Sequence, residues 1–204
     1  MRKVQDYYFK KAKKENYPAR SVYKLEETQK KYQLLKTGDT VLDLGCQPGS
    51  WSIFAARIVG PKGLIVGVDL QDGKKISVAK AAEIVWFCED IMADDIVAKI
   101  QKIRKSFRII LSDIAPRTSG NKWVDQQQSL KLARRVLELT EQLLESGGNF
   151  YVKVFEGEDF KEFVDSVRKH FKTVKVIKPK SSRNESREVF VLGMGNRQEV
   201  RREA

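Results

Sequence analysis

Short apolar runs alternate with stretches of helical periodicity along most of this chain. Seven runs have the length and the β-branched or aromatic content of strands: TVLDLG (40–45), LIVGVDL (64–70), IVWFCED (84–90), SFRIILSDIAP (106–116), NFYVKVF (149–155), TVKVI (173–177) and REVFVLG (187–193). Helices are predicted over 20–35, 51–60, 76–82, 93–105, 126–145 and 158–171, and Gly147-Gly148 is expected to close the fifth of these. Residues 1–20 are polar and show no clear period.

This alternation predicts an α/β fold. The interior strands are continuous apolar runs, as expected of a doubly wound, mostly parallel seven-stranded sheet with helices on both faces. No crossover helix separates the last two runs, so we expect the last strand to be antiparallel. A chain of 204 residues suits one domain. We expect a basic N-terminal extension over 1–20, a single domain over 21–195 and a polar C-terminal tail over 196–204.

Positive charge is concentrated at the two ends of the chain, and the net charge is +12. Residues 1–40 hold 11 basic and 5 acidic side chains, and residues 168–204 hold 11 basic and 4 acidic ones. The segment between them holds 17 basic and 18 acidic side chains. Clustered lysines and arginines bind phosphate backbones through counterion release, so this distribution favours a nucleic-acid partner. An ordinary solvated surface is the alternative interpretation.

The counts of histidine, cysteine and apolar residues exclude several classes of protein. One His excludes a multi-histidine metal site, and two Cys without a CxxC pair indicate neither a zinc ribbon nor a disulfide framework. The start of the chain has no apolar signal segment, and no apolar stretch reaches 18 residues. We therefore expect a cytoplasmic, monomeric protein with no membrane association and no metal.

The first strand leads into a glycine- and proline-containing turn. This turn includes Gly45, Pro48 and Gly49, and the helix that follows begins near Trp51. Glycines allow a ligand to approach the backbone closely, and ligands of doubly wound sheets bind at such strand ends. The turn reads GxxPG, which argues against the GxGxxG turn of nicotinamide-dependent oxidoreductases, and no triphosphate-binding loop is present. An ordinary tight turn is the alternative.

Acidic residues follow the next two strands. Asp69 can accept hydrogen bonds from ribose hydroxyls, and Asp90 is placed to address an adenine amino group. Together with the glycine turn they indicate a ligand that contains adenosine. A neutral to acidic loop suits the cationic sulfonium of S-adenosylmethionine better than a pyrophosphate.

Four charged residues occupy positions where a purely structural role is hard to explain: Lys24, Asp113, Lys153 and Glu188. Lys153 interrupts an apolar strand, which is costly unless the lysine is paired or functional. An edge strand with Lys153 facing water is the alternative. Two lysines and two carboxylates could also satisfy one another, and such clusters occur at functional sites.

Several segments carry a resemblance to a known family: ARSVYKLEE (19–27), DLGCQPGSWS (43–52), GVDL (67–70), LSDIAPRTSG (111–120), YVKVFEGE (151–158) and KPKSSRNESREVFVL (178–192). In this order and spacing the chain closely resembles the FtsJ/RrmJ-type 2′-O-ribose methyltransferases of large-subunit ribosomal RNA. The resemblance implies a Rossmann-like fold and methyl transfer from S-adenosylmethionine to a ribose 2′-hydroxyl, for which we expect a uridine. It also implies ribosomal RNA, free or within the large subunit, as the partner.

The resemblance assigns roles to particular residues. The family's catalytic tetrad falls on Lys24, Asp113, Lys153 and Glu188, with Lys153 as the general base. Its cofactor positions fall on Gly49, Trp51, Asp69, Asp90 and Asp113, and Gly45 and Pro48 belong to the same turn. For Trp51 a role as a core aromatic is an equal alternative.

The chain departs from the family at Cys46, Gln47 and Ser50 in the turn and at Arg117 after Asp113. No role is transferred to these four residues. A tRNA-directed relative is the nearest competing interpretation, and the Ser-Arg-Glu-Val sequence at 186–189 favours the ribosomal one. A catalytically idle RNA-binding protein on the same fold is the alternative from another class.

Overall fold

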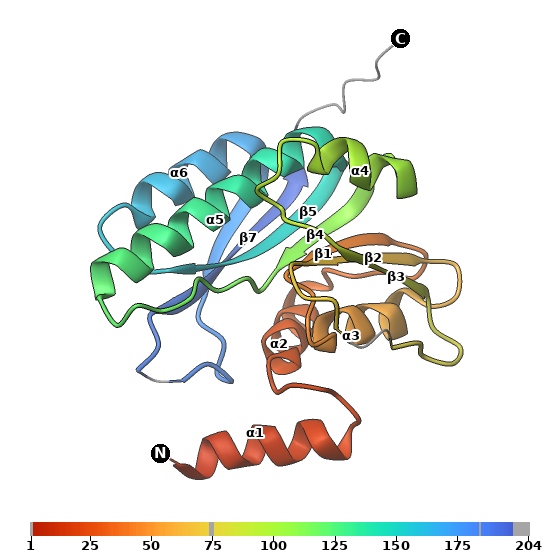
Figure 1. Cartoon of the computed structure of the whole chain (residues 1–204), viewed down its shortest axis with the longest axis horizontal. Helices are drawn as coiled ribbons and strands as arrows, with labels where there is room; N and C mark the ends of the chain where they lie inside the picture. The colour runs from red at the N-terminus through yellow and green to blue at the C-terminus, as the bar shows by residue number, and fades with distance from the viewer. Residues whose placement is uncertain (1, 74–75, 184, 198–204) are drawn as a thin grey trace.

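The structure is a computed structural model that describes residues 2–73, 76–183 and 185–197. Seven strands form one sheet in the order β3-β2-β1-β4-β5-β7-β6 (Figure 1). Their bounds are β1 (Thr40–Leu44), β2 (Leu64–Asp69), β3 (Glu83–Cys88), β4 (Phe107–Ser112), β5 (Leu144–Phe155), β6 (Phe171–Ile177) and β7 (Glu188–Asn196). Strand β7 is antiparallel to both β5 and β6, and the remaining pairs are parallel. The predicted fold class is therefore confirmed, including the antiparallel last strand.

Helices cover both faces of the sheet. Helices α2 (Val22–Tyr32) and α3 (Ser50–Val59) lie on one face, and α1 (Arg2–Lys14) packs on the outer side of α2 (Figure 1). Helices α4 (Ile96–Ile103), α5 (Lys122–Leu143) and α6 (Phe160–His170) lie on the other face. Because β1 pairs with β2 on one side and with β4 on the other, the winding of the chain reverses between β1 and β4.

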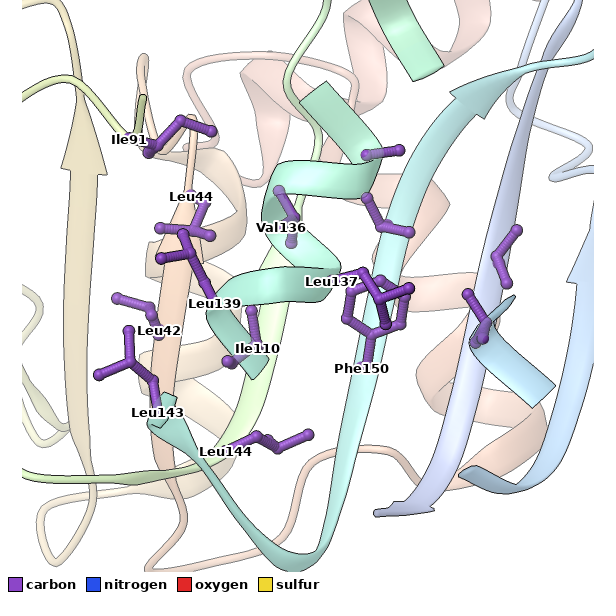
Figure 2. Packing of buried hydrophobic residues seen from close by; sticks show 14 of the residues in the cluster. Leu42, Leu44, Ile91, Ile110, Val136, Leu137, Leu139, Leu143, Leu144 and Phe150 are labelled. Atoms are coloured by element: carbon purple, nitrogen blue, oxygen red, sulfur yellow. The ribbon is translucent and has the colours of Figure 1, made fainter. Parts of the chain in front are cut away.

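The larger hydrophobic core lies between α5 and the centre of the sheet. Figure 2 shows Val136, Leu137 and Leu139 of α5 facing Ile110 of β4 and Phe150 of β5. These side chains are buried, and each large one contributes about 1.5–3 kcal/mol relative to an exposed position. This packing holds the central strands rigidly, so the residues at their ends are fixed relative to one another.

Three local predictions were wrong. Helix α1 was missed because its inward positions include a lysine, Lys11, beside Tyr8 and Ala12, so no apolar period is visible. The predicted helix over 76–82 is absent from the described residues of that segment, where Lys80 has a φ of 58° that a right-handed helix does not allow.

The third wrong prediction concerns the end of the longest helix. Helix α5 ends at Leu143, and Gly147 and Gly148 lie within β5 instead of closing the helix. The pairing of β4 with β5 shifts register between Phe107 and Ile109, whose partners on β5 are Leu144 and Asn149. The two glycines therefore lie in the irregular first part of β5.

The predicted domain limits remain a prediction. Strand β7 runs to Asn196, the first residue of the expected polar tail, and residues 198–204 of that tail lie outside the described residues. Within the described part of the chain, no helix combines the length and the apolar character needed to cross a membrane.

Candidate active site

The predicted site residues line one edge of the sheet in the order of its strands. Asp90 follows β3, Asp69 ends β2 and Gly45 follows β1. Continuing along the same edge, Asp113 follows β4 and Lys153 lies near the end of β5. Glu188 is the first residue of β7, and because β7 is antiparallel its beginning lies beside the end of β5, where Glu188 pairs in register with Phe155. The edge thus carries the predicted cofactor residues on one side and the predicted catalytic residues on the other.

The four predicted catalytic residues form one connected ion cluster. Nζ of Lys153 lies 2.9 Å from Oδ1 of Asp113 and also donates to the Asp113 backbone oxygen at 2.6 Å. Nζ of Lys24 lies 3.4 Å from the same Oδ1 and 2.9 Å from Oε2 of Glu188. Asp113 is therefore shared by both lysines, and Lys24 joins the two carboxylates.

The position of Lys153 excludes the edge-strand interpretation. Strand β5 lies between β4 and β7, and the Lys153 residue is only 6% exposed. Side chains alternate along a strand, so Lys153 shares its face with Tyr151, while Val152 and Val154 point into the other core. That face meets α2, which is why a lysine from a helix early in the chain reaches it.

Helix α2 holds the cluster through three further contacts. Glu27, one turn after Lys24, accepts the backbone N–H groups of Lys180 and Ser181 at 2.8 and 3.0 Å. Thr28 donates to the hydroxyl of Tyr151 at 2.8 Å, next to Lys153 on β5. The helix therefore binds both the β6–β7 loop that leads to Glu188 and the strand that bears Lys153.

The glycine turn brings the backbone after β1 close to the loop after β4. Gly45 has a φ of 76°, and a Cβ there would lie 3.2 Å from the Cα of Ile114 and collide with the Ile114 side chain. Gly49 has a φ of 105° and precedes α3, and the Gln47–Pro48 peptide between them is cis. A side chain at residue 45 would displace the segment that begins with Asp113, so the glycine is required for this approach.

Asp43 is a buried carboxylate in β1, just before the glycine turn, and it is not among the site residues predicted from the sequence. It accepts a hydrogen bond from the Ser52 hydroxyl at 2.6 Å, which ties β1 to the first turn of α3. Burial raises the pKa of Asp43 to about 7; the Ser52 hydrogen bond opposes the shift, and the charges of Asp113 and Asp69 add to it. A polar residue within the apolar run TVLDLG was the signal that could have identified it.

Asp69 and Asp90 accept backbone hydrogen bonds that hold the loops around them. Oδ2 of Asp69 accepts the N–H of Gln47 at 2.9 Å, and its Oδ1 accepts the N–H of Gln71 at 2.9 Å. Oδ1 of exposed Asp90 accepts the N–H of Met92 at 2.8 Å. A carboxylate has about four acceptor sites, so both retain lone pairs for a ligand.

Trp51 is buried and its polar group is satisfied within the chain. Its indole N–H donates to the Ser21 carbonyl at 2.8 Å, and its ring stacks on Tyr151 with centroids 5.6 Å apart. These contacts account for Trp51 as a core aromatic, and contact with the cofactor remains a prediction.

Three of the departures from the family's turn have structural roles. The Ser50 hydroxyl accepts the Ala19 N–H at 2.7 Å and so joins α3 to the segment before α2. The Gln47 backbone N–H binds Asp69, and its side chain lies against Gly73. Cys46 is buried, and burial raises the pKa of its thiol, which makes it a poor nucleophile.

No group of three or more His, Cys, Asp or Glu side chains that could hold a metal ion occurs within residues 2–73, 76–183 and 185–197.

Comparison with known proteins assigns this chain to a family. The sequence profile of the FtsJ-like methyltransferases matches residues 17–196, so the chain belongs to that family. The Ribosomal RNA large subunit methyltransferase E of Desulfotalea psychrophila is 58% identical over 197 residues, which cover 97% of this chain and 98% of that protein. The protein of the same name from Desulfosudis oleivorans is 46% identical over 197 residues, covering 97% and 93%. A crystal structure described as a ribosomal RNA methyltransferase from Plasmodium falciparum superposes with a TM-score of 0.76 at 28% identity, covering 88% of this chain and 98% of that one.

Proposed function

We propose that this protein transfers a methyl group from S-adenosylmethionine to a ribose 2′-hydroxyl of large-subunit ribosomal RNA, with a uridine as the target. The observation that carries the proposal is the cluster of Lys153, Asp113, Lys24 and Glu188, in which a buried lysine is held by one aspartate at two of its atoms. The names of the two bacterial relatives support ribosomal RNA as the substrate.

The residues along the β1–β3 side of the edge fit S-adenosylmethionine. At Gly45 and Gly49 an added Cβ would meet Ile114 or Trp86, so the two glycines keep the turn compact, and Asp69 keeps free lone pairs for ribose hydroxyls. Asp90 would address the adenine, and Pro48 and Trp51 would border the same site. When bound, this cofactor supplies a methyl group on a sulfonium, whose carbon–sulfur bond breaks as a neutral thioether leaves.

Lys153 would act as the general base. To accept the proton of the 2′-hydroxyl its amine must be unprotonated, and a neutral amine has two N–H donors and one lone pair. The two acceptors of Asp113, Oδ1 at 2.9 Å and the backbone oxygen at 2.6 Å, match those two donors. The lone pair is then left for the substrate, so Asp113 orients the base as well as binding it.

Lys24 and Glu188 would position the ribose. Their contact at 2.9 Å joins α2 to the start of β7, and both side chains are only partly buried. Because a sulfonium is already a good leaving group, most of the acceleration would come from alignment of the hydroxyl oxygen with the methyl group and sulfur. Alignment of this kind supplies about 7–11 kcal/mol in well-oriented reactions.

The decisive experiment incubates the protein and labelled S-adenosylmethionine with total RNA, with naked ribosomal RNA and with isolated large subunits, and then maps the modified nucleotide. Label on a uridine 2′-oxygen of large-subunit RNA is expected, and the comparison of naked RNA with subunits identifies the substrate form. Label confined to tRNA would refute the ribosomal assignment. Binding of RNA without any transfer would favour the idle RNA-binding alternative. With this function we also predict that the protein is located in the cytoplasm, where ribosomes assemble. We predict that it is a monomer.

A further inference from the structure

Helix α1 exposes a face that the rest of the described chain does not cover. Five exposed residues form this outer face: Tyr7, Phe9, Lys10, Lys13 and Lys14. At 100° per residue they occupy an arc of about 160° in which the three lysines lie between the two aromatic rings. Tyr7 is 60% and Phe9 64% exposed. Figure 1 shows α1 on the outside of α2, with no other element on its far side.

The opposite face fixes α1 to the helix that bears Lys24. The ring of Tyr8 packs on Tyr23 with centroids 5.2 Å apart, and Nζ of Lys11 lies 3.4 Å from Oε2 of Glu26. The Tyr23 hydroxyl donates to Glu15, the residue that follows α1, at 2.9 Å. The outer face is therefore displayed on an anchored helix, and its inner partners on α2 lie on both sides of Lys24 in the sequence.

We propose that the outer face of α1 binds an unpaired segment of RNA, with bases stacked on Tyr7 and Phe9 and phosphates paired with Lys10, Lys13 and Lys14. This inference rests on the proposed function and adds the part of the substrate that α1 would hold. Large rings that remain exposed beside cations are the combination that binds single-stranded nucleic acid without base readout. The lysines would repel a second copy of the same face, which disfavours self-association as the reason for the exposed rings.

We expect the outer face of α1 to bind unpaired RNA more tightly than paired RNA. Stacking on Tyr7 and Phe9 needs accessible base faces, whereas the lysines would attract either form through its phosphates. Helix α1 is about 20 Å long, so it spans several nucleotides of an extended strand.

The test measures RNA affinity by fluorescence anisotropy, with a short labelled single-stranded RNA and its duplex as probes, and requires no turnover. Loss of the rings in Tyr7→Ala/Phe9→Ala is expected to weaken single-strand binding about tenfold or more and to change duplex binding little. Tyr7→Phe/Phe9→Tyr keeps both rings and is expected to retain the affinity. The third variant removes the lysine charges: Lys10→Gln/Lys13→Gln/Lys14→Gln. It is expected to weaken the binding of both probes and to reduce the slope of the logarithm of the binding constant against the logarithm of the salt concentration by about 2.

A matched control changes three exposed lysines near the opposite edge of the sheet. Lys62 precedes β2, Lys102 lies in the last turn of α4 and Lys105 precedes β4. The variant Lys62→Gln/Lys102→Gln/Lys105→Gln removes the same charge and is expected to alter the salt slope much less. Equal slopes in the two lysine variants, or wild-type single-strand affinity in the ring-deleted variant, would overturn the proposal.

Sedimentation and cofactor titration separate the remaining outcomes. A wild-type dimer that becomes a monomer in Tyr7→Ala/Phe9→Ala would assign the face to a second copy and overturn the RNA assignment. Wild-type melting temperature and S-adenosylmethionine affinity in the variants are expected, because the changed side chains are exposed. If wild type fails to methylate ribosomal RNA, the proposed function fails, while the affinity comparison still decides the role of α1.

Discussion

Lys153 is held by Asp113 at two atoms, because its Nζ lies 2.9 Å from the carboxylate Oδ1 and 2.6 Å from the backbone oxygen of the same residue. This double contact fixes both the position and the orientation of the amine. Asp113 lies just beyond β4 and Lys153 lies in the adjacent strand β5, so the pair depends on the register between those strands, in which Ser112 faces Val152.

Replacement of Lys153 by Met tests the general base. Methionine keeps an unbranched side chain of similar length in this buried position but cannot accept a proton, so the methylation rate is expected to fall by at least 10²–10⁴-fold. Isothermal titration is expected to show nearly unchanged S-adenosylmethionine affinity. Lys131→Met, an exposed position on α5, serves as the control. Near-normal turnover by Lys153→Met would contradict the assignment.

Glu27→Ala tests whether α2 positions the loop that leads to Glu188. Its carboxylate accepts two backbone N–H groups of that loop, so its removal leaves both donors without this partner. We expect a loss of about 1–3 kcal/mol in the free energy of unfolding, measured by urea denaturation, together with a lower methylation rate at saturating cofactor. Glu138→Ala removes an exposed carboxylate that pairs with Arg135, and little change is expected there. Equal behaviour of the two variants would argue against a positioning role for Glu27.

Gly45→Ala tests the close approach of the turn to the Asp113 loop. Alanine in the left-handed backbone conformation of residue 45 costs about 1–2 kcal/mol, and its Cβ also displaces Ile114. Gly38→Ala is the matched control, because Gly38 has a φ of 86° and an added Cβ would meet nothing within 4 Å. Thermal unfolding is expected to show a larger loss for Gly45→Ala, and methylation is expected to fall only in that variant. If the two alanine variants lose the same stability, the contact with Ile114 is unimportant.

Asp43→Asn tests the raised pKa of the buried carboxyl. The pKa of Asp43 is about 7 in the folded protein and near 3.8 when unfolded, so the folded state binds the extra proton and loses stability as pH rises through 7. Between pH 5 and 8 this group is expected to lower the free energy of unfolding by roughly 2–3 kcal/mol. Asparagine cannot ionise but can still accept from Ser52, so the variant should gain stability relative to wild type as pH increases. Parallel urea titrations at several pH values measure this difference, and a constant difference would contradict the shift.

The local sequence pattern accounts for the strands and for most of the helices. Continuous apolar runs such as the one ending at Leu44 can only be buried on both faces, which determines a covered parallel sheet. The pattern failed where tertiary contacts decide the outcome. Helix α1 has Lys11 on its inner face, where it pairs with Glu26, and Glu15 just after the helix accepts a hydrogen bond from Tyr23, so polar contacts take the place of an apolar stripe.

The candidate site, too, could be predicted from the sequence only in part. The charged residues Lys24, Asp113, Lys153 and Glu188 were identifiable from the sequence because each stands in or beside an apolar segment and within a family motif. The contacts among these four side chains were not identifiable from the sequence. Lys24 and Glu188 are 164 positions apart and meet only because α2 packs across β5 and β7.

What the sequence by itself determined is the seven strands, most of the helices, the glycine turn and the identity of the charged residues, since these follow from local periodicity and residue chemistry. Only the tertiary structure decided that Asp113 binds both lysines, that Glu27 holds the β6–β7 loop and that Tyr7 and Phe9 remain outside the core. The physical reason is that distances between residues far apart in the chain are set by strand register and helix packing, which depend on all the packed side chains together.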